Sequence, residues 1–406
     1  MKTLFKYCAP LILFGLLSCQ NEEQKWFKGN LHTHTYWSDG DAFPEMVLDW
    51  YKSNGYDFVS LTDHNTLQQG EKWKKIPKSH IYQQAFDDYL SAYGTDWVEY
   101  SRDSAGLMVR LKTEEEYLPL FQDKDFLIMR GLEITDSYNG KPLHMNATNV
   151  KNLIEPRHGN SVAEVLQNNI NAVLEQREAT GQPIMPHINH PNFGWAISLE
   201  DMIALKGERF FEVFNGHPSV NNYGDSIRLS TEQMWDAINI AYLERGQPIM
   251  YGIATDDSHY YHQFGPQFSN SGRGWVMVEA RELNGNAIVE AMEEGKFYAS
   301  TGVKLSNYRV KEGTISLTIE AEEGVTYKTS LIGVRKGRKK AEVLAIKGGA
   351  EVQLAIPNDV LFVRTKIVSS RLKENPFEEG DFETAWTQPV APQGRSVKGI
   401  IYSGAY

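Results

Sequence analysis

The chain has 406 residues, of which 41% are hydrophobic, 12% aromatic and 23% charged, and this balance excludes a disordered or fibrous protein. The length is sufficient for one large and one small domain with a sizeable buried core. The 52 Asp and Glu residues outnumber the 41 Lys and Arg residues, so the net charge is −11. We expect no nucleic-acid partner, because proteins that follow a phosphate backbone need a basic surface; only a locally basic groove would change that expectation.

The N-terminus has the pattern of a bacterial lipoprotein signal peptide over residues 1–18. Lys2 and Lys6 precede an apolar stretch, Ala9–Leu17, that is too short to span a bilayer. The stretch ends in Leu16-Leu17-Ser18-Cys19, which resembles the lipobox whose cysteine becomes lipidated. The alternative is a buried N-terminal helix with an incidental cysteine.

Cleavage before Cys19 also removes Cys8, so the mature chain has no partner for an intrachain disulfide. Residues 19–26 then form a polar tether, and the lipid on Cys19 anchors the protein to a membrane. The predicted location is the bacterial cell envelope outside the cytoplasmic membrane, either periplasmic or at the cell surface.

Short apolar runs alternate with helical patterns over most of residues 27–303, which predicts βα units around a parallel sheet and an α/β fold class. About seven strands are expected, fewer than the eight of a standard TIM barrel. They lie near Gly29–His34, Asp57–Thr62, Phe126–Glu133, Leu143–Val150, Ile184–His190, Phe210–Phe214 and Ile249–Thr255.

Helix signals separate these strands. A helix is expected to start at Pro44 and to end before Gly55, because proline suits the first turn and glycine the residue after the last. A capping box at Ser161 opens a second helix that Gly181 closes, and the same signal recurs at Ser230.

Two further regions depart from the βα pattern. Residues 68–125 are too long for a strand connection and are rich in Trp and Tyr, which predicts a mostly helical insertion that acts as a lid. In residues 304–406 the apolar residues alternate strictly, as in Ile315, Leu317 and Ile319. This period predicts a C-terminal β-sandwich-like domain.

Six of the eleven histidines lie near predicted strands, beside acidic residues. Strand ends of a βα barrel converge on one pocket, so residues far apart in sequence become neighbours there. His32 and His34 are two residues apart, so both side chains point to one face of a strand. The candidate ligands are His32, His34, Asp39, His64, Glu133, His144, His190, Asp257 and His259.

Each candidate has a structural alternative when it is taken alone. The His-Thr-His sequence arises by chance, Asp63-His64 suits a helix cap, and Glu133 suits an exposed loop. Burial of all these groups in one pocket without cations would cost several kcal/mol in unpaired charge. We therefore predict a metal site, and its mixed imidazole and carboxylate ligands favour Zn, Mn or Fe over Ca.

Four segments in order resemble the motifs of the PHP (polymerase and histidinol phosphatase) family. They are Asn30-Leu31-His32-Thr33-His34-Thr35 with Ser38-Asp39-Gly40, Leu61-Thr62-Asp63-His64-Asn65, His190-Pro191-Asn192 and Thr255-Asp256-Asp257-Ser258-His259. The resemblance covers roughly two-thirds of the chain. It implies a distorted seven-stranded (β/α) barrel in residues 27–303, with two or three divalent metal ions that hydrolyse phosphoesters.

The resemblance also distributes the ligands over three ions. The first ion takes His32, His34, Glu133 and Asp257, the second takes Glu133, His144 and His190, and the third takes Asp39, His64 and His259. Asp39 stands where some relatives of this family have His. His187 competes with His144 for its part of the site, and it could equally orient another ligand.

In the predicted chemistry, two cations that Glu133 bridges hold a hydroxide between them, and Asp257 is a further ligand of the first cation. Two cations lower the pKa of a bound water from 15.7 toward about 7 and so create a nucleophile. Asp63 and a metal-bound water are the candidates for the acid that protonates the leaving oxygen.

Four residues near the expected pocket are candidates for substrate binding. Glu212 and Asn215 lie at the end of the sixth strand, and Glu212 could instead orient a metal ligand. His217 follows in a polar loop, where it contacts a phosphate or caps the loop. Arg273, between two glycines, suits a bidentate phosphate clamp, with a surface turn as its alternative.

The sequence therefore predicts a metal-dependent phosphoric ester hydrolase that acts on a small phosphorylated substrate. One alternative is a carboxylic ester or amide hydrolase, since a metal-bound hydroxide also attacks carbonyl carbons. Another is a non-catalytic surface lipoprotein that binds glycans or proteins through the aromatic insertion and the β domain.

Overall fold

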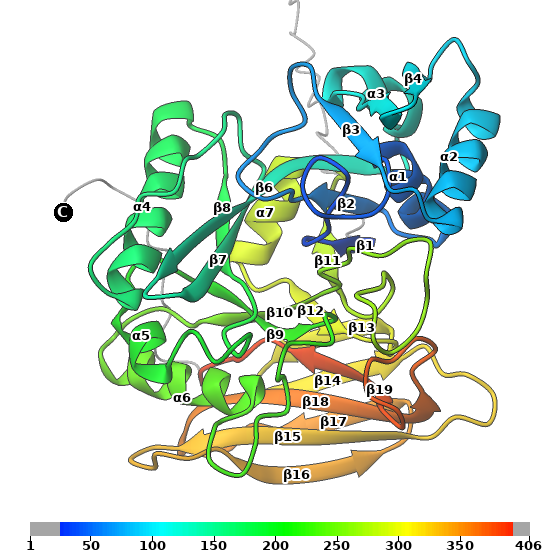
Figure 1. Cartoon of the computed structure of the whole chain (residues 1–406). Coiled ribbons are helices and arrows are strands. Elements are labelled where there is room, and N and C mark those ends of the chain that lie inside the picture. Colours follow the sequence, from blue (N-terminus) through cyan, green and yellow to red (C-terminus); the bar gives the residue numbers. More distant parts are fainter. Residues whose placement is uncertain (1–24, 393–406) are drawn as a thin grey trace, which may run out of the picture.

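The computed structural model describes residues 25–392, which form a mixed α/β fold built on one large sheet (Figure 1). The predicted signal peptide, Cys19 and most of the predicted tether lie outside the described residues, as do residues 393–406. Lys25 and Trp26, at the end of that tether, already belong to the first strand. Within residues 25–392, no helix is both long and apolar enough to cross a lipid bilayer.

Thirteen strands form the large sheet, and all seven strands expected in the α/β region are among them. In order across the sheet they are β10 (Tyr251–Thr255), β9 (Phe210–Asn215), β8 (Met185–Ile188), β7 (Lys141–Thr148), β6 (Leu127–Tyr138), β2 (Phe58–Leu61), β1 (Lys25–Asn30), β11 (Trp275–Ala280), β12 (Phe297–Ser300), β19 (Phe382–Thr387), β18 (Val360–Leu372), β15 (Tyr327–Arg335) and β16 (Glu342–Gly348). The sheet ends at β10 and at β16, so it is open and not a closed barrel.

Strands β6 and β7 form an antiparallel hairpin where the sequence pattern predicts a parallel βα unit. The turn is Asn139-Gly140, whose φ angles of 49° and 76° are the positive values that a tight two-residue hairpin turn needs. Strand β7 is also antiparallel to β8, whereas the pairs β1–β2, β2–β6, β8–β9 and β9–β10 are parallel. As a result, His144 reaches the site from within β7 rather than from a strand end.

Helices on the strand connections pack against the sheet through three apolar clusters, one with α4, α5 and α6, one with α1 and one with α7. They are α1 (Pro44–Ser53), α4 (Val162–Thr180), α5 (Leu199–Ala204), α6 (Thr231–Glu244) and α7 (Gly285–Glu293). The expected end signals are confirmed: Gly55 and Gly181 have positive φ just after α1 and α4. The Ser161 hydroxyl accepts from Glu164 N and caps α4, but the Glu164 carboxylate accepts from Asn160 N, so the capping box expected there is incomplete. Ser230 forms a full capping box with Gln233 at the start of α6.

Residues 68–125 form an insertion of mixed structure, so the prediction of a mostly helical insertion is wrong. Its elements are β3 (Trp73–Ile76), α2 (His80–Tyr93), β4 (Tyr100–Asp103), β5 (Gly106–Arg110) and α3 (Glu114–Phe121). The three strands form an antiparallel sheet. Phe86 and Val109 of the insertion share a buried core with Tyr36 and Trp37, in the loop after β1, and this core fixes the insertion beside that loop.

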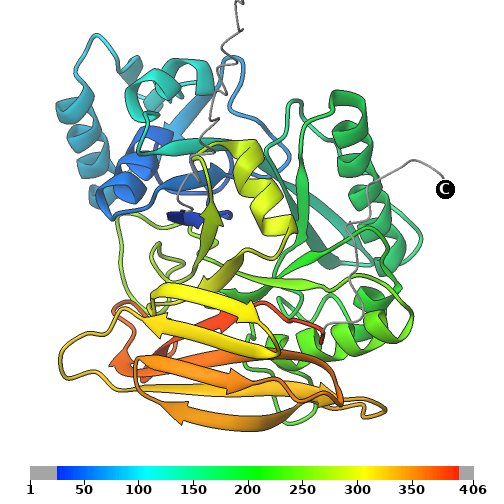
Figure 2. The same ribbon diagram turned by 180° about the vertical axis from the view of Figure 1, so that it is seen from behind.

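The strands after residue 304 lie in two layers (Figure 2). A second sheet contains β13 (Leu305–Lys311), β14 (Thr314–Ile319) and β17 (Glu351–Ala355). Its side chains Ile315 and Val352 share a core with Leu331 and Val363 of the large sheet, which is the layering that strict alternation of apolar residues favours. Because β12 pairs with β19, the large sheet continues across the predicted domain boundary.

A buried ion pair joins these strands to α6. Arg364 on β18 donates from Nε and Nη2 to both oxygens of Asp236, at 2.8 and 2.9 Å. Glu232 also accepts from Nη2 at 3.3 Å. Because a buried charge is costly without its partner, this bidentate pair fixes the position of α6, the helix that follows β9.

Glu208 is buried just before β9, at the end of that strand opposite Asn215. Its Oε1 accepts hydrogen bonds from the backbone N–H groups of Arg209 and Phe210, at 2.7 and 2.6 Å. Burial raises the pKa of Glu208 from 4.5 to about 8. Between these pH values the unfolded chain loses a proton that the folded chain keeps, so this carboxyl group lowers the stability as the pH rises.

We expect Glu208→Gln to raise the midpoint of thermal unfolding at pH 8 and to change it little at pH 4.5. The amide retains the acceptor oxygen but has no proton to lose, so the stability cost above pH 4.5 disappears. Thermal unfolding of both proteins at the two pH values tests this expectation. An equal difference between them at both pH values would contradict it.

Candidate metal centre

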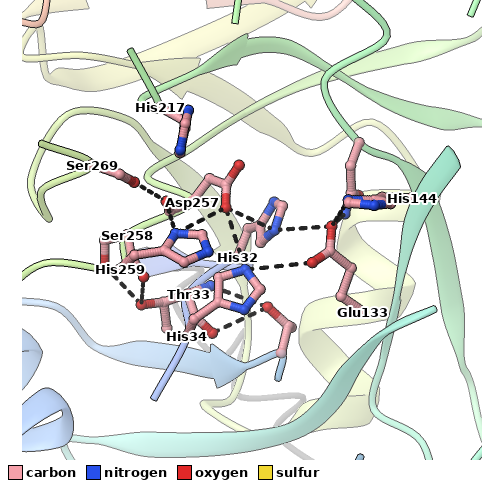
Figure 3. Close-up of polar contacts among 12 residues, drawn as sticks. His32, Thr33, His34, Glu133, His144, His217, Asp257, Ser258, His259 and Ser269 are labelled. Carbon is pink, nitrogen blue, oxygen red and sulfur yellow. Dashed lines mark hydrogen bonds and ion pairs between the residues drawn. The ribbon is translucent and has the colours of Figure 1, made fainter. Parts of the chain in front are cut away.

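Figure 3 shows His32, His34, Glu133, His144, Asp257 and His259 gathered around one volume. All the candidate ligands lie close together in space. They comprise His32 and His34 after β1, Asp39 in the following turn, His64 after β2, Glu133 in β6, His144 in β7, His190 after β8, and Asp257 and His259 after β10. The structure therefore brings together all nine ligands proposed from the sequence.

Two backbone segments that run side by side place the central ligands. His34 N donates to Ser258 O and Asp257 N donates to His32 O, both at 3.0 Å. Strand β1 ends before His32, so the two histidines lie beyond the strand and not within it. These hydrogen bonds and a parallel bridge between Thr33 and Ser258 position the segment, and both imidazoles face Asp257.

The central imidazole and carboxylate atoms are spaced like ligands of shared cations. His32 Nε2 lies 3.4 Å from Glu133 Oε1 and 3.2 Å from Asp257 Oδ1. His34 Nε2 lies 3.4 Å from Glu133 Oε2 and 3.3 Å from the same Asp257 oxygen. Two ligand atoms about 2.1 Å from one tetrahedral ion are about 3.4 Å apart, whereas N–H···O hydrogen bonds are commonly about 2.9 Å.

Asp39 forms an outer group with three histidines. Its carboxylate oxygens lie 3.6 Å from His34 Nδ1, 3.4 Å from His64 Nε2 and 3.4 Å from His259 Nε2. The Asp39 side chain is 57% exposed, whereas the central carboxylates are buried. The outer group is therefore the part of the centre that solvent and solutes can reach.

Glu133 connects the central group to a third group, which contains His64 and His144. His64 Nδ1 and His144 Nδ1 lie 2.8 and 3.1 Å from its carboxylate. His190 Nε2 lies farther away, 3.6 Å from Glu133 and 3.8 Å from Asp257. Glu133 thus has both oxygens next to imidazoles from several strands, which is the arrangement of a bridging carboxylate.

Three buried atoms at the centre have no hydrogen-bond partner among the described residues: His32 Nε2, His34 Nε2 and Glu133 Oε2. A buried polar group without a partner costs about 1–3 kcal/mol. Divalent cations would satisfy all three atoms at once, and imidazole and carboxylate donors are those that transition-metal ions prefer. The residues present therefore fit a centre for divalent metal ions.

Nearby imidazoles keep the two central carboxylates ionised. Burial alone would raise the pKa of Glu133, but His64 and other histidines hold this pKa well below its usual range. Burial alone would also raise the pKa of Asp257, but nearby histidines, His32 above all, hold this pKa well below its usual range. Both groups are anions at neutral pH, the form that binds cations.

Glu212 and Asn215 contact the metal-ligand candidates and orient them, which for Glu212 is the alternative that the sequence left open and for Asn215 replaces the predicted contact with substrate. Glu212 Oε1 lies 2.7 Å from His32 Nδ1, and in the neutral ring this bond places the proton on Nδ1 and leaves Nε2 available to a cation. The other oxygen accepts from the His190 backbone N–H at 2.7 Å. Asn215 donates to Glu212 Oε2 at 2.8 Å and to Asp257 Oδ2 at 3.1 Å.

Asp63 is not available as the predicted leaving-group acid. Its oxygens accept hydrogen bonds from Thr35 N and Oγ1 at 2.8 Å and from Ser38 Oγ at 2.6 Å. Gln68 Nε2 donates to it at 2.7 Å. These donors fill the carboxylate, so Asp63 instead fixes the turn that carries Asp39.

Gly40 allows this turn to fold closely over the first histidine pair. A Cβ atom at position 40 would lie 2.6 Å from the backbone carbon of His34, closer than real contacts permit. The glycine of Ser38-Asp39-Gly40 is thus needed for the approach of Asp39 to the histidines.

Arg273 does not form the predicted phosphate clamp. It is 2% exposed, and its guanidinium donates to the carbonyl oxygens of Gly216, Phe268, Gly265 and Asn375, at 2.6–3.0 Å. With these donors occupied, Arg273 holds together the loops around the centre and does not bind a substrate.

His217 lies beside the centre, with its ring centroid 5.7 Å from that of His259. Its Nδ1 accepts from Ser219 N at 3.1 Å, so the proton of the neutral ring is on Nε2. Burial lowers the pKa of His217 to about 4, which keeps the ring neutral at physiological pH. His217 therefore remains a candidate donor to a bound substrate.

The structure separates the positions of His144 and His187, the two histidines that compete for one part of the site. His144 faces Glu133, whereas His187 is fully buried, and its Nε2 lies 3.7 Å from Glu212. Sequence reasoning missed a further residue, Asn189, which donates to Glu133 Oε1 at 2.7 Å. Its signal is a polar amide between two histidines after an apolar strand.

Two ligands occupy backbone conformations that L-residues rarely adopt. The φ angles of His190 and Asp257 are 22° and 50°. Such conformations cost about 1–3 kcal/mol and persist only where surrounding contacts enforce them. The Asp257 and His190 backbone N–H groups are held by His32 O and Glu212, so the strain is located at the metal centre itself.

No protein-family model matches the chain, and no curated protein matches it significantly. Among solved structures, it is similar to a two-domain protein from Bacteroides vulgatus that contains a predicted PHP-like metal-dependent phosphoesterase, with 14% identity, a TM-score of 0.39 and coverage of 90% of this chain and 96% of that one.

Two further similarities are weaker. A candidate metal-dependent phosphoesterase from Bifidobacterium adolescentis has 13% identity and a TM-score of 0.30, over 58% of this chain and 88% of its own. An amidohydrolase from Chromobacterium violaceum, with bound sulfate and no metal, has 12% identity and a TM-score of 0.26, over 57% and 87%. Such low scores assign no function, so the functional conclusion depends on the geometry of the centre.

Glu212→Gln is expected to weaken metal binding about 10–100-fold, because the amide no longer fixes the protonation of His32 as a carboxylate does. Glu208→Gln is the matched control, since Glu208 is a buried acid just before the same strand, four residues before Glu212. Competition with a chromophoric chelator measures both affinities. Equal affinity of Glu212→Gln and the wild type would contradict the assigned role.

Proposed function

We propose that this protein is a metal-dependent phosphoesterase of the PHP type that acts on a small phosphorylated substrate. The observation that carries the proposal is the position of Glu133, whose two oxygens lie 3.1–3.4 Å from imidazole nitrogens of His32, His34 and His144. This spacing supports two or three ions, of Zn, Mn or Fe, around one bridging carboxylate. The seven strands that surround the centre would be an open variant of the distorted barrel of that family.

Divalent cations held there would supply Lewis acidity and a nucleophile derived from water. The chain's own residues would set the geometry of the reaction. Glu133 and Asp257 would hold the cations close together, and Glu212 would keep the His32 ring in place. His217 Nε2–H would donate to the phosphoryl group or the leaving oxygen.

The accessible part of the centre favours a phosphoryl group over a carbonyl group as the target. A phosphoester carries anionic oxygens that several neighbouring cations can bind together. The outer group at Asp39 opens to solvent next to the central group, so cations in both would face one substrate. A carbonyl oxygen would use only one of them.

We expect the metal-free protein to be inactive and Mn, Zn or Fe to restore hydrolysis of p-nitrophenyl phosphate or bis-p-nitrophenyl phosphate. Glu133→Gln should lower the rate by about 100-fold or more, since loss of a bridging ligand exceeds the cost of losing a residue that orients one. Glu208→Gln, remote from the centre, should retain the rate. Turnover of p-nitrophenyl acetate with no phosphoester hydrolysis would instead favour the acyl hydrolase alternative.

We also propose that the enzyme is anchored in the cell envelope through Cys19. The support is the sequence pattern of residues 1–19 alone. Expression in a bacterium with labelled palmitate should label the wild type, and Cys19→Ser should be unlabelled. Label on Cys19→Ser, or none on the wild type, would contradict the anchor and leave the proposed chemistry untouched.

A further inference from the structure

One lysine of the insertion lies beside the outer group of the metal centre. Lys74, on β3, donates from Nζ to Ser38 O at 3.2 Å, and its ammonium lies 4.9 Å from the centroid of the Tyr36 ring. Ser38 directly precedes Asp39, whose carboxylate faces three histidines. The ammonium group thus lies against the backbone of the turn that carries Asp39.

The surrounding contacts hold this lysine in place. Trp37, two residues before Asp39, donates from Nε1 to Lys112 O at 3.0 Å, and Lys72 Nζ donates to Trp37 O. The apolar side chain of Ile76 also packs in the core that contains Trp37. These bonds attach both edges of the insertion to the turn after β1, so Lys74 is not a freely mobile surface lysine.

Lys74 has donors to spare. An ammonium group has three N–H bonds, and among the described residues the one acceptor of Lys74 is Ser38 O. Of the other lysines at the edges of the insertion, Lys72 donates to Trp37 O, and Lys112 is engaged with Glu99 at 3.0 Å and Glu116 at 3.5 Å. Two N–H bonds of Lys74 therefore remain for a ligand.

The charges around Lys74 indicate what that ligand is. Burial and the nearby charge of Lys72 lower the pKa of Lys74, while Asp39 and Asp63 act to raise it, so these charged groups lie within electrostatic range. A cation bound at Asp39 would neutralise that carboxylate and leave an ammonium and a metal ion as neighbours. Two cations side by side repel each other unless an anion lies between them.

We propose that Lys74 binds an anionic oxygen of the substrate's phosphate group and favours phosphate monoesters, which carry one more charge than diesters. This inference rests on the proposed function and names the residue that distinguishes substrates by the charge of their phosphate group. A lysine acts as a point charge toward phosphate and needs no planar geometry, which suits a site at the edge of a metal cluster.

The test uses the full mature chain loaded with metal, and it compares Lys74→Met, Lys74→Gln, Lys74→Arg and Lys75→Met. Lys75 is the matched control, because it is the next residue of β3, is exposed, and points to the opposite face near Gly106. Metal content and thermal unfolding are measured for each protein, and isothermal titration calorimetry measures the affinity for inorganic phosphate.

The Lys74→Met and Lys74→Gln variants should bind phosphate about tenfold more weakly or worse, the usual loss for one charge-assisted hydrogen bond. Their KM for p-nitrophenyl phosphate should rise by a similar factor, with kcat nearly unchanged and a smaller rise for bis-p-nitrophenyl phosphate. Lys74→Arg should recover most of the affinity, and Lys75→Met should match the wild type.

Unchanged phosphate affinity in folded, metal-loaded Lys74→Met or Lys74→Gln would overturn the inference while the proposed function stands. A loss of metal content together with affinity would also overturn it, because Lys74 would then support the turn and not the ligand. A wild-type protein that binds metal but neither binds phosphate nor hydrolyses either ester would overturn the proposed function itself.

Discussion

Two buried carboxylates, Glu133 and Asp257, are the constraint on which the rest of this structure depends. Both are almost wholly inaccessible to solvent, and the imidazoles of His32 and His34 lie 3.2–3.4 Å from them, farther than in ordinary hydrogen bonds. Such groups are stable in a low-dielectric interior only with compensating positive charge. Divalent cations bound at the candidate ligands would supply that charge.

The polar network around the cluster follows from this need. Glu212 and Asn215 contact the ligands from behind, and Asp63 holds the turn that carries Asp39. Arg273 ties the neighbouring loops through their carbonyl oxygens. None of these polar groups faces a substrate, because each has its hydrogen-bonding capacity filled by the protein. They make the ligand positions rigid before any ion or substrate binds.

The rest of the chain supports the loops that carry the candidate ligands. The insertion is fixed beside the turn after β1 by a shared apolar core, and it extends the accessible side of the centre with a lysine. On the other side, Arg364 and Asp236 fasten α6 to the strands that follow residue 304. The large sheet runs through both regions, so backbone hydrogen bonds between β12 and β19 join them directly.

The sequence by itself determined the seven strands of the α/β region, the ends of three helices and the set of nine candidate ligands. Each of these depends on local chemistry, such as a capping serine, a glycine with positive φ or a histidine beside a strand end. Tertiary structure alone decided the roles of Arg273, Asp63 and Glu212, because a polar side chain binds whatever its neighbours leave unsatisfied. It also decided that the sheet is open and that β7 is antiparallel, since strand direction depends on pairing between distant segments.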